Sequence, residues 1–150
     1  MSPAGSRRRR EPSPFDTAAS GRIPYAEHLV HTTEMGHLVR SKSELIIANK
    51  LWALGIPYEY EREFRGDRVP GFALPDFTFE TPDGSVIIWE HLGLLDKPRY
   101  RVDWDNKLRW YLENGLEEGR TLFTTREDGG RGIQMPEITA IAERIRREIA

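Results

Sequence analysis

The sequence contains no cysteine, which excludes disulfide bonds and cysteine-ligated zinc sites. It also lacks any apolar run of the roughly 20 residues that a membrane-spanning helix needs. No apolar segment follows the arginine run Arg7–Arg10, so a secretion signal is not indicated. We therefore expect a cytoplasmic protein that does not bind membranes. The net charge of −2 does not by itself indicate a protein that binds nucleic acid.

Positive charge is nevertheless concentrated at the amino terminus. Residues 1–21 are rich in Ser, Pro, Gly, Ala and Arg and have little to bury, so we expect a disordered basic arm there. Residues 22–150 are long enough for a single domain with its own core. The arm would either contact phosphate groups or only increase solubility, and the sequence leaves both interpretations open.

The hydrophobic pattern behind the arm predicts an α/β domain. A capping box in Ser41–Glu44 opens a helix that closes at Gly55, and residues 23–39 form a short helix or an irregular segment. The remaining elements are expected to be a strand over 56–64, two strands within 74–93, a helix over 99–114, a strand over 121–125 and a helix over 136–149. The predicted order is α-β-β-β-α-β-α.

Two carboxylates interrupt the apolar pattern of the paired strands. Asp76 begins the first strand and Glu90 lies near the end of the second, with a turn at Thr81–Gly84 between them. Because side chains alternate along a strand, Asp76 points away from Phe77 and Glu90 shares a face with Ile88, so the two acids can converge at one end of the sheet if the strands pair. Adjacent carboxylates repel each other unless a cation or a proton lies between them. Their oxygen atoms suit Mg²⁺ or Mn²⁺.

Two helical residues could join these acids. Glu44 lies at the edge of the buried face of its helix, where it either only completes the capping box with Ser41 or reaches the acids. Lys107 is centred on an aromatic stripe, so either its stem turns outward to solvent or its ammonium group meets the acids. The stripe consists of Tyr100, Trp104 and Tyr111.

The histidines give a weaker signal. Residues 28–37 carry three of them and a glutamate, and exposed surface histidines are a commoner explanation than a metal site. These four residues are His28, His31, Glu34 and His37. On an alternating strand the ring of His91 points away from Glu90, so we do not assign it as a general base.

Pro75-Asp76, followed 14 residues later by Glu90 in this order of elements, resembles the PD-(D/E)XK nuclease superfamily over roughly residues 40–125. The resemblance implies a restriction-endonuclease-like core, with a mixed sheet of about four strands flanked by helices. It implies that Asp76, Glu90 and the backbone carbonyl of His91 bind Mg²⁺ or Mn²⁺. Glu44 would bind the ion directly or through a water molecule.

The sequence departs from that family pattern at one position. The pattern has lysine two residues after the second acid, where this chain has Leu92. Some members supply the lysine from a neighbouring helix, and Lys107 is well placed to do so, whereas Lys42 is less suited. The segment Trp89–Gly93 with Tyr100 and Lys107 is also similar to nuclease domains attached to DNA helicases.

The resemblance implies a magnesium-dependent endodeoxyribonuclease. Its catalytic residues would be Glu44, Asp76, Glu90 and Lys107. Tyr100, Arg126 and Lys97 are candidate contacts to DNA, with solvated surface charge as the simpler interpretation of the last two. A helicase or a component of a mobile element or defence complex would direct it, and a dimer is compatible with it. The alternatives are an inactive nuclease-fold module that binds DNA or a protein, and an unrelated α/β interaction domain.

Overall fold

The computed structural model describes residues 26–127 and 132–150, so the predicted arm over 1–21 lies outside the described residues. These residues form a mixed α/β structure with three α-helices and a four-stranded sheet, as the sequence predicts. The elements are η4 (Ala26–His28), β1 (His31–Thr32), β2 (Leu38–Val39), α1 (Lys42–Ala53), β3 (Glu59–Tyr60), β4 (Phe64–Arg65), β5 (Phe72–Ala73), β6 (Phe77–Glu80), β7 (Val86–Leu92), α2 (Pro98–Glu113), β8 (Leu122–Arg126) and α3 (Met135–Ile149).

The main sheet has the strand order β3-β6-β7-β8. β6 is antiparallel to β3 and to β7, whereas β7 and β8 are parallel and are connected by α2. A parallel connection needs such a crossover because the chain must return to the same end of the sheet. Counting only this sheet and the α-helices, the observed order is the predicted α-β-β-β-α-β-α.

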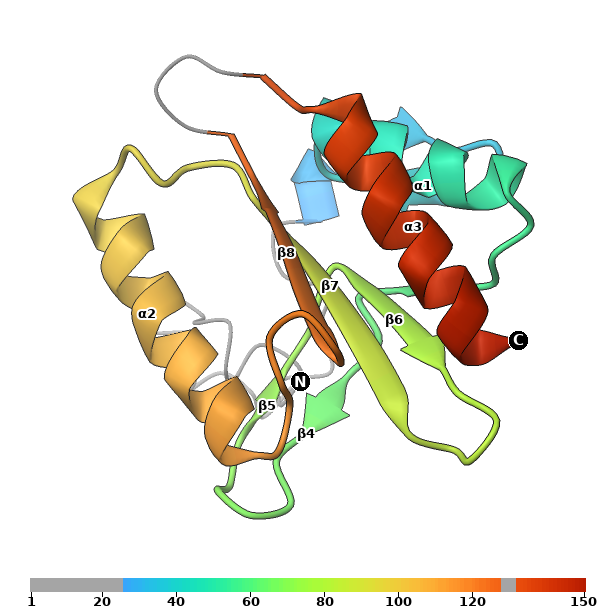
Figure 1. Cartoon of the computed structure of the whole chain (residues 1–150). Coiled ribbons are helices and arrows are strands. Elements are labelled where there is room, and N and C mark those ends of the chain that lie inside the picture. Colours follow the sequence, from blue (N-terminus) through green and yellow to red (C-terminus); the bar gives the residue numbers. More distant parts are fainter. Residues whose placement is uncertain (1–25, 128–131) are drawn as a thin grey trace, which may run out of the picture.

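The sheet lies between two helical layers, with α2 on one face and α1 and α3 on the other (Figure 1). β7 is therefore buried on both faces. Ile87 and Trp89 pack in the core formed with α1 and α3, whereas Ile88 and Leu92 pack in a second core beneath α2. In the described ranges, no helix is long and apolar enough to cross a membrane.

Helix α1 begins and ends as its sequence predicts. The Ser41 hydroxyl accepts a hydrogen bond from the Glu44 backbone N–H (3.1 Å), which caps the amino terminus of the helix. Gly55 follows the helix with a φ of 71°, a left-handed conformation that favours glycine. The face that α1 buries carries Ile47, Ala48 and Leu51.

One prediction of local structure is wrong. The expected strand over 56–64 is interrupted at Glu61, whose φ is 54°, so β3 pairs with β6 whereas β4 pairs with β5 in a separate hairpin. The Phe64 ring packs against α2 rather than continuing the main sheet. The segment expected to be a short helix or irregular contains, over its described residues 26–39, the short helix η4 followed by the β1–β2 hairpin, whose turn contains Gly36 with a φ of 107°.

Candidate active site

Asp76 and Glu90 lie side by side at one end of the sheet. The antiparallel pairing of Phe77 with Trp89 brings them opposite each other. Glu90 Oε1 accepts a hydrogen bond from the Asp76 backbone N–H (3.2 Å), and Asp76 Oδ2 accepts one from the His91 backbone N–H (2.7 Å). The two acids therefore converge as the alternation of side chains predicts.

Helix α2 supplies the cation of this site. Lys107 Nζ lies 2.6 Å from Glu90 Oε2, and the Tyr111 hydroxyl donates to the same oxygen at 2.7 Å. Lys107 is only 9% exposed and Glu90 only 4%, so the ammonium group points inward instead of reaching solvent. Leu92, two residues after Glu90, is 2% exposed and packs in the core beneath α2.

The Glu44 carboxylate binds groups that precede α1 and lie on β3. Glu44 Oε1 accepts hydrogen bonds from the Tyr60 hydroxyl (2.6 Å) and from the Arg40 backbone N–H (3.2 Å). Burial is the main cause that raises the pKa of Glu44, while the hydrogen bond from Tyr60 acts in the opposite direction. Tyr60 pairs with Phe77 across β3 and β6, which brings Glu44 to the same end of the sheet as Asp76.

The carboxylates influence one another electrostatically. Burial, followed by the charges of Glu44 and Glu90, raises the pKa of Asp76 well above its usual value. The His91 N–H and Lys107 lower it only in part. Burial and then the charges of Asp76 and Glu90 also raise the pKa of Tyr100, so its hydroxyl lies within the field of the acids.

The donor chemistry of this acid cluster, which we define as Glu44, Asp76 and Glu90, fits Mg²⁺ or Mn²⁺. Lys107 pairs with Glu90, and the charges of Glu44 and Glu90 add to burial in raising the pKa of Asp76, so a divalent cation bound here would favour the ionised carboxylates. The His91 peptide also adjoins Asp76 through its N–H. Within 26–127 and 132–150, no group of three or more His, Asp or Glu side chains is already arranged to hold a metal ion.

The remaining candidate residues differ in how exposed they are. Tyr100 is partly buried in α2, whereas Arg126 at the end of β8 and Lys97 at the N-cap of α2 are exposed. Lys42 is exposed at the first position of α1. The exposure of Arg126 and Lys97 leaves both interpretations of these residues open, phosphate contact and solvated surface charge.

The histidine-rich segment does not gather into a site among the described residues. The His37 ring instead packs against β3, where its Nε2 lies 2.6 Å from the Tyr58 hydroxyl. It also stacks on Tyr60, with 5.4 Å between the ring centroids. His37 therefore joins the β1–β2 hairpin to the edge of the main sheet.

Sequence reasoning missed the partners of the His91 ring. His91 Nδ1 lies 2.7 Å from Thr125 Oγ1, and Nε2 lies 2.6 Å from Glu127 Oε2. The Ser43 hydroxyl, from α1, donates to the same Glu127 oxygen. The predicted opposite orientations of His91 and Glu90 agree with this arrangement, but only the three-dimensional structure brings residues 43, 91 and 127 together.

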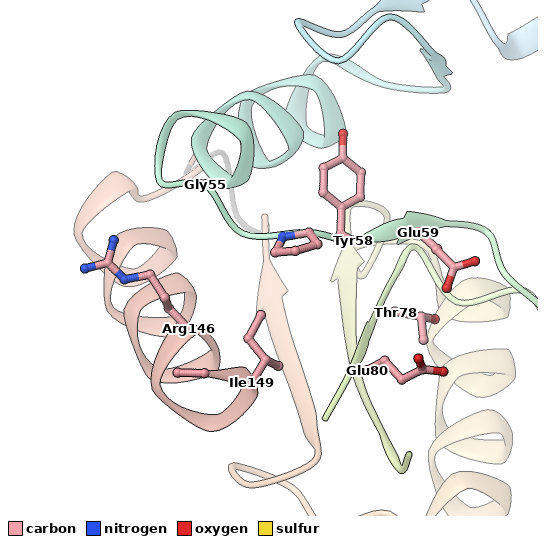
Figure 2. A pocket seen from close by; sticks show the side chains of 9 residues that line it. Gly55, Tyr58, Glu59, Thr78, Glu80, Arg146 and Ile149 are labelled. Carbon is pink, nitrogen blue, oxygen red and sulfur yellow. The ribbon is translucent and has the colours of Figure 1, made fainter. Parts of the chain in front are cut away.

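A separate pocket of about 420 Å³ lies beside β3 and the end of α3 (Figure 2). Its lining contains none of the acid cluster and does not contain Lys107. The lining residues are Gly55, Pro57, Tyr58, Glu59, Thr78, Glu80, Arg146, Ile149 and Ala150. We assign no chemistry to it.

Comparison with known proteins gives one informative match. No family model matches the chain, and no solved structure matches it. The chain is 34% identical over 96 residues to Uncharacterized protein MJ1519 of Methanocaldococcus jannaschii. The match covers 63% of this chain but spans only 8% of the relative's length, so the relative is a much longer protein.

Proposed function

We propose that this protein is a magnesium- or manganese-dependent endodeoxyribonuclease with a restriction-endonuclease-like core of the PD-(D/E)XK type. The observation that carries the proposal is the buried contact of 2.6 Å between Lys107 Nζ and Glu90 Oε2. It brings a lysine to the acid pair although the usual lysine position is occupied by Leu92. The sheet order and the Asp76–Glu90 pairing support the same proposal.

The acid cluster would hold the metal ion. Asp76, Glu90 and the His91 carbonyl are the proposed ligands, with Glu44 binding directly or through a water molecule. When bound, the ion supplies Lewis-acid stabilisation of the charge that develops on the phosphate and assists ionisation of the attacking water. Tyr111 holds the Glu90 carboxylate in one orientation through its buried hydroxyl.

Lys107 has two roles in the proposed reaction. Its ammonium group offsets negative charge on the scissile phosphate, and one of its three N–H donors orients the attacking water. Low exposure strengthens both effects because little solvent screens the charge. Tyr100, Lys97 and Arg126 surround this end of the sheet and are proposed to contact the DNA backbone.

The proposed enzyme acts in the cytoplasm with a partner that directs it to DNA, such as a helicase or a component of a mobile element or defence complex. Similarity to a segment of a much longer protein supports a module that works together with other domains. Each active site cuts one strand, so cleavage of both strands requires two protomers or two successive events.

Cleavage assays with matched variants test the proposal. Supercoiled plasmid and labelled single-stranded and branched DNA are incubated with Mg²⁺, Mn²⁺ or EDTA. Asp76→Ala and Glu90→Ala should abolish metal-dependent cleavage, and Lys107→Ala should lower its rate by about 10²-fold to 10³-fold because a buried electrostatic contact is lost. Lys42→Ala, which removes an exposed lysine, should cleave like the wild type. Unchanged cleavage by Asp76→Ala would refute the site.

A second candidate function is binding without cleavage. The observation that favours it is that both oxygens of Glu90 already have protein donors: Asp76 N–H on Oε1, and Lys107 and Tyr111 on Oε2. Under this candidate, the wild type would bind DNA with an affinity that falls steeply with salt but would cut no substrate with either metal. A binding titration across salt concentrations, run beside the cleavage assay, separates the two functions.

A further inference from the structure

Three elements meet on the side of β7 opposite the Glu90 side chain. Glu127 Oε2, just after β8, accepts from the Ser43 hydroxyl of α1 and lies 2.6 Å from His91 Nε2 of β7. The Glu127 backbone N–H donates to the Leu92 carbonyl (3.0 Å), which fixes this residue against the end of β7. One carboxylate oxygen thus joins a helix to a strand. We call Ser43, His91 and Glu127 the latch.

The donors in the latch follow from the neighbouring hydrogen bonds. Thr125 Oγ1 accepts from the Trp89 indole N–H (3.2 Å) and lies 2.7 Å from His91 Nδ1, whereas an ionised Glu127 carboxylate can only accept. His91 Nε2–H then donates to Glu127. This direction satisfies both nitrogens of the buried ring and fixes its orientation. Burial alone would raise the pKa of Glu127, but the hydrogen bonds from Ser43 and His91 outweigh it and lower that pKa.

Each end of the latch adjoins a member of the acid cluster. Ser43 directly precedes Glu44, and the His91 backbone N–H donates to Asp76 Oδ2. A shift of α1 relative to β7 would therefore move Glu44 away from Asp76. Glu127 also lies near the amino terminus of α1, where a negative charge is favourable.

We propose that Glu127 is a positioning residue that holds Glu44 and the His91 peptide in place relative to Asp76 and Glu90. It does so from the face of the sheet opposite Glu90, through Ser43 and His91. Residues that orient metal ligands typically change metal affinity by about 10-fold to 100-fold when they are removed. This inference rests on the proposed function for its metal readout.

The experiment measures Mn²⁺ affinity by titration and amide hydrogen exchange by NMR on the full chain. Glu127→Ala should weaken Mn²⁺ binding by about 10-fold to 100-fold. It should also accelerate exchange of the Glu44 and Leu45 amides, which mark the first turn of α1, but leave the Leu51 amide unchanged. Glu80→Ala, which removes an exposed glutamate from the end of β6, is the matched control and should change neither readout.

Two further variants separate positioning from charge and from general destabilisation. Glu127→Gln should retain most of the affinity, because its amide oxygen can accept the same two hydrogen bonds. Combining Ser43→Ala with Glu127→Ala should weaken Mn²⁺ binding no more than Glu127→Ala alone, since both changes break one connection. Equal losses in the Gln and Ala variants, or wild-type affinity in Glu127→Ala, would overturn the proposal.

Failure of the proposed function gives a different result. A wild type that neither binds Mn²⁺ nor cuts DNA would refute the nuclease proposal. The latch is then decided by hydrogen exchange alone: faster exchange at Glu44 and Leu45 in Glu127→Ala supports it, and unchanged exchange overturns it.

Discussion

The two faces of the β6–β7 pair differ sharply although neighbouring residues form them. Towards α1 and α3, Phe77 and Trp89 pack in an apolar core. Towards α2, the next residues along the same strands are Asp76 and Glu90, which meet Lys107. Because side chains alternate along a strand, a single hairpin packs an apolar core on one face and places two carboxylates beside a second apolar core on the other.

The comparison shows how a buried charge is tolerated. An unpaired carboxylate beneath α2 would be costly, but Glu90 accepts hydrogen bonds and pairs with an ammonium group within the same layer. Asp76 has less compensation, as its raised pKa indicates. The apolar face should therefore determine stability, whereas parts of the charged face should reduce it.

The largest effect is expected on the apolar face. Phe77 is fully buried against Tyr58, Tyr60 and Trp89, so Phe77→Ala should lower the free energy of unfolding by about 3–5 kcal/mol through lost burial and a cavity. Urea denaturation measures it. Phe77→Leu, which fills part of the cavity, should cost less. A loss below about 1 kcal/mol for Phe77→Ala would contradict the assigned role of this face.

An intermediate effect is expected where the charged face is well compensated. Tyr111→Phe keeps the buried ring but removes the hydrogen bond to Glu90, so it should cost about 1.5–3 kcal/mol in the metal-free protein. Urea denaturation in EDTA measures this difference. Tyr100→Phe is the matched control on the same helix, and it should cost less because its hydroxyl bonds to the neutral Gly93 backbone instead of to a carboxylate. Equal losses in the two variants would show that the Glu90 contact has no special weight.

The smallest expected effect is a gain of stability instead of a loss. Asp76→Asn keeps an acceptor for the His91 N–H but removes a carboxylate whose pKa is raised, so it should increase Tm of the metal-free protein by about 2–4 °C near neutral pH. A raised pKa means that the native state prefers the protonated acid. Stability from Asp76 is therefore present at low pH and lost as the pH rises through its folded pKa. The advantage of Asp76→Asn should accordingly vanish in acid, as thermal scans across pH would show.

Asp83 is the matched control for the direction of this stability change. Hydrogen bonds from Thr81 and Ser85 lower the pKa of this exposed turn residue to about 2. Its contribution to stability is present above the unfolded pKa and is lost as the pH falls towards 2. Asp83→Asn should thus destabilise the protein near neutral pH, opposite to Asp76→Asn. A common sign for both variants would show that burial does not distinguish the two aspartates.

Local chemistry explains what could be predicted from the sequence. The turn at Thr81–Gly84 and the alternation on either side of it sufficed to pair Asp76 with Glu90. The cap at Ser41 and the glycine at Gly55 sufficed to bound α1. These signals depend on residues close together in the chain, so no knowledge of tertiary packing was needed.

The remaining features depend on contacts between distant segments. The strand expected over 56–64 divides because Phe64 packs on α2, which a period-two pattern does not reveal. Tyr60 and Glu127 likewise look like ordinary strand and loop residues until the fold brings them to Glu44 and His91. In the sequence Glu127 begins the turn-like run Glu127-Asp128-Gly129-Gly130, so no spacing rule would have singled it out.

Helix α2 both covers one face of the sheet and carries the lysine of the candidate site. It covers Leu92 and Ile88, and it also carries Lys107. Local unfolding of this helix would therefore hydrate the sheet and remove the ammonium group from Glu90 in a single event. Its far end is anchored, because the Trp110 indole donates to the Val69 and Pro70 carbonyls of the β4–β5 loop. By anchoring this end of α2, the β4–β5 hairpin helps to keep Lys107 beside Glu90, although it contributes no charge to the acid cluster.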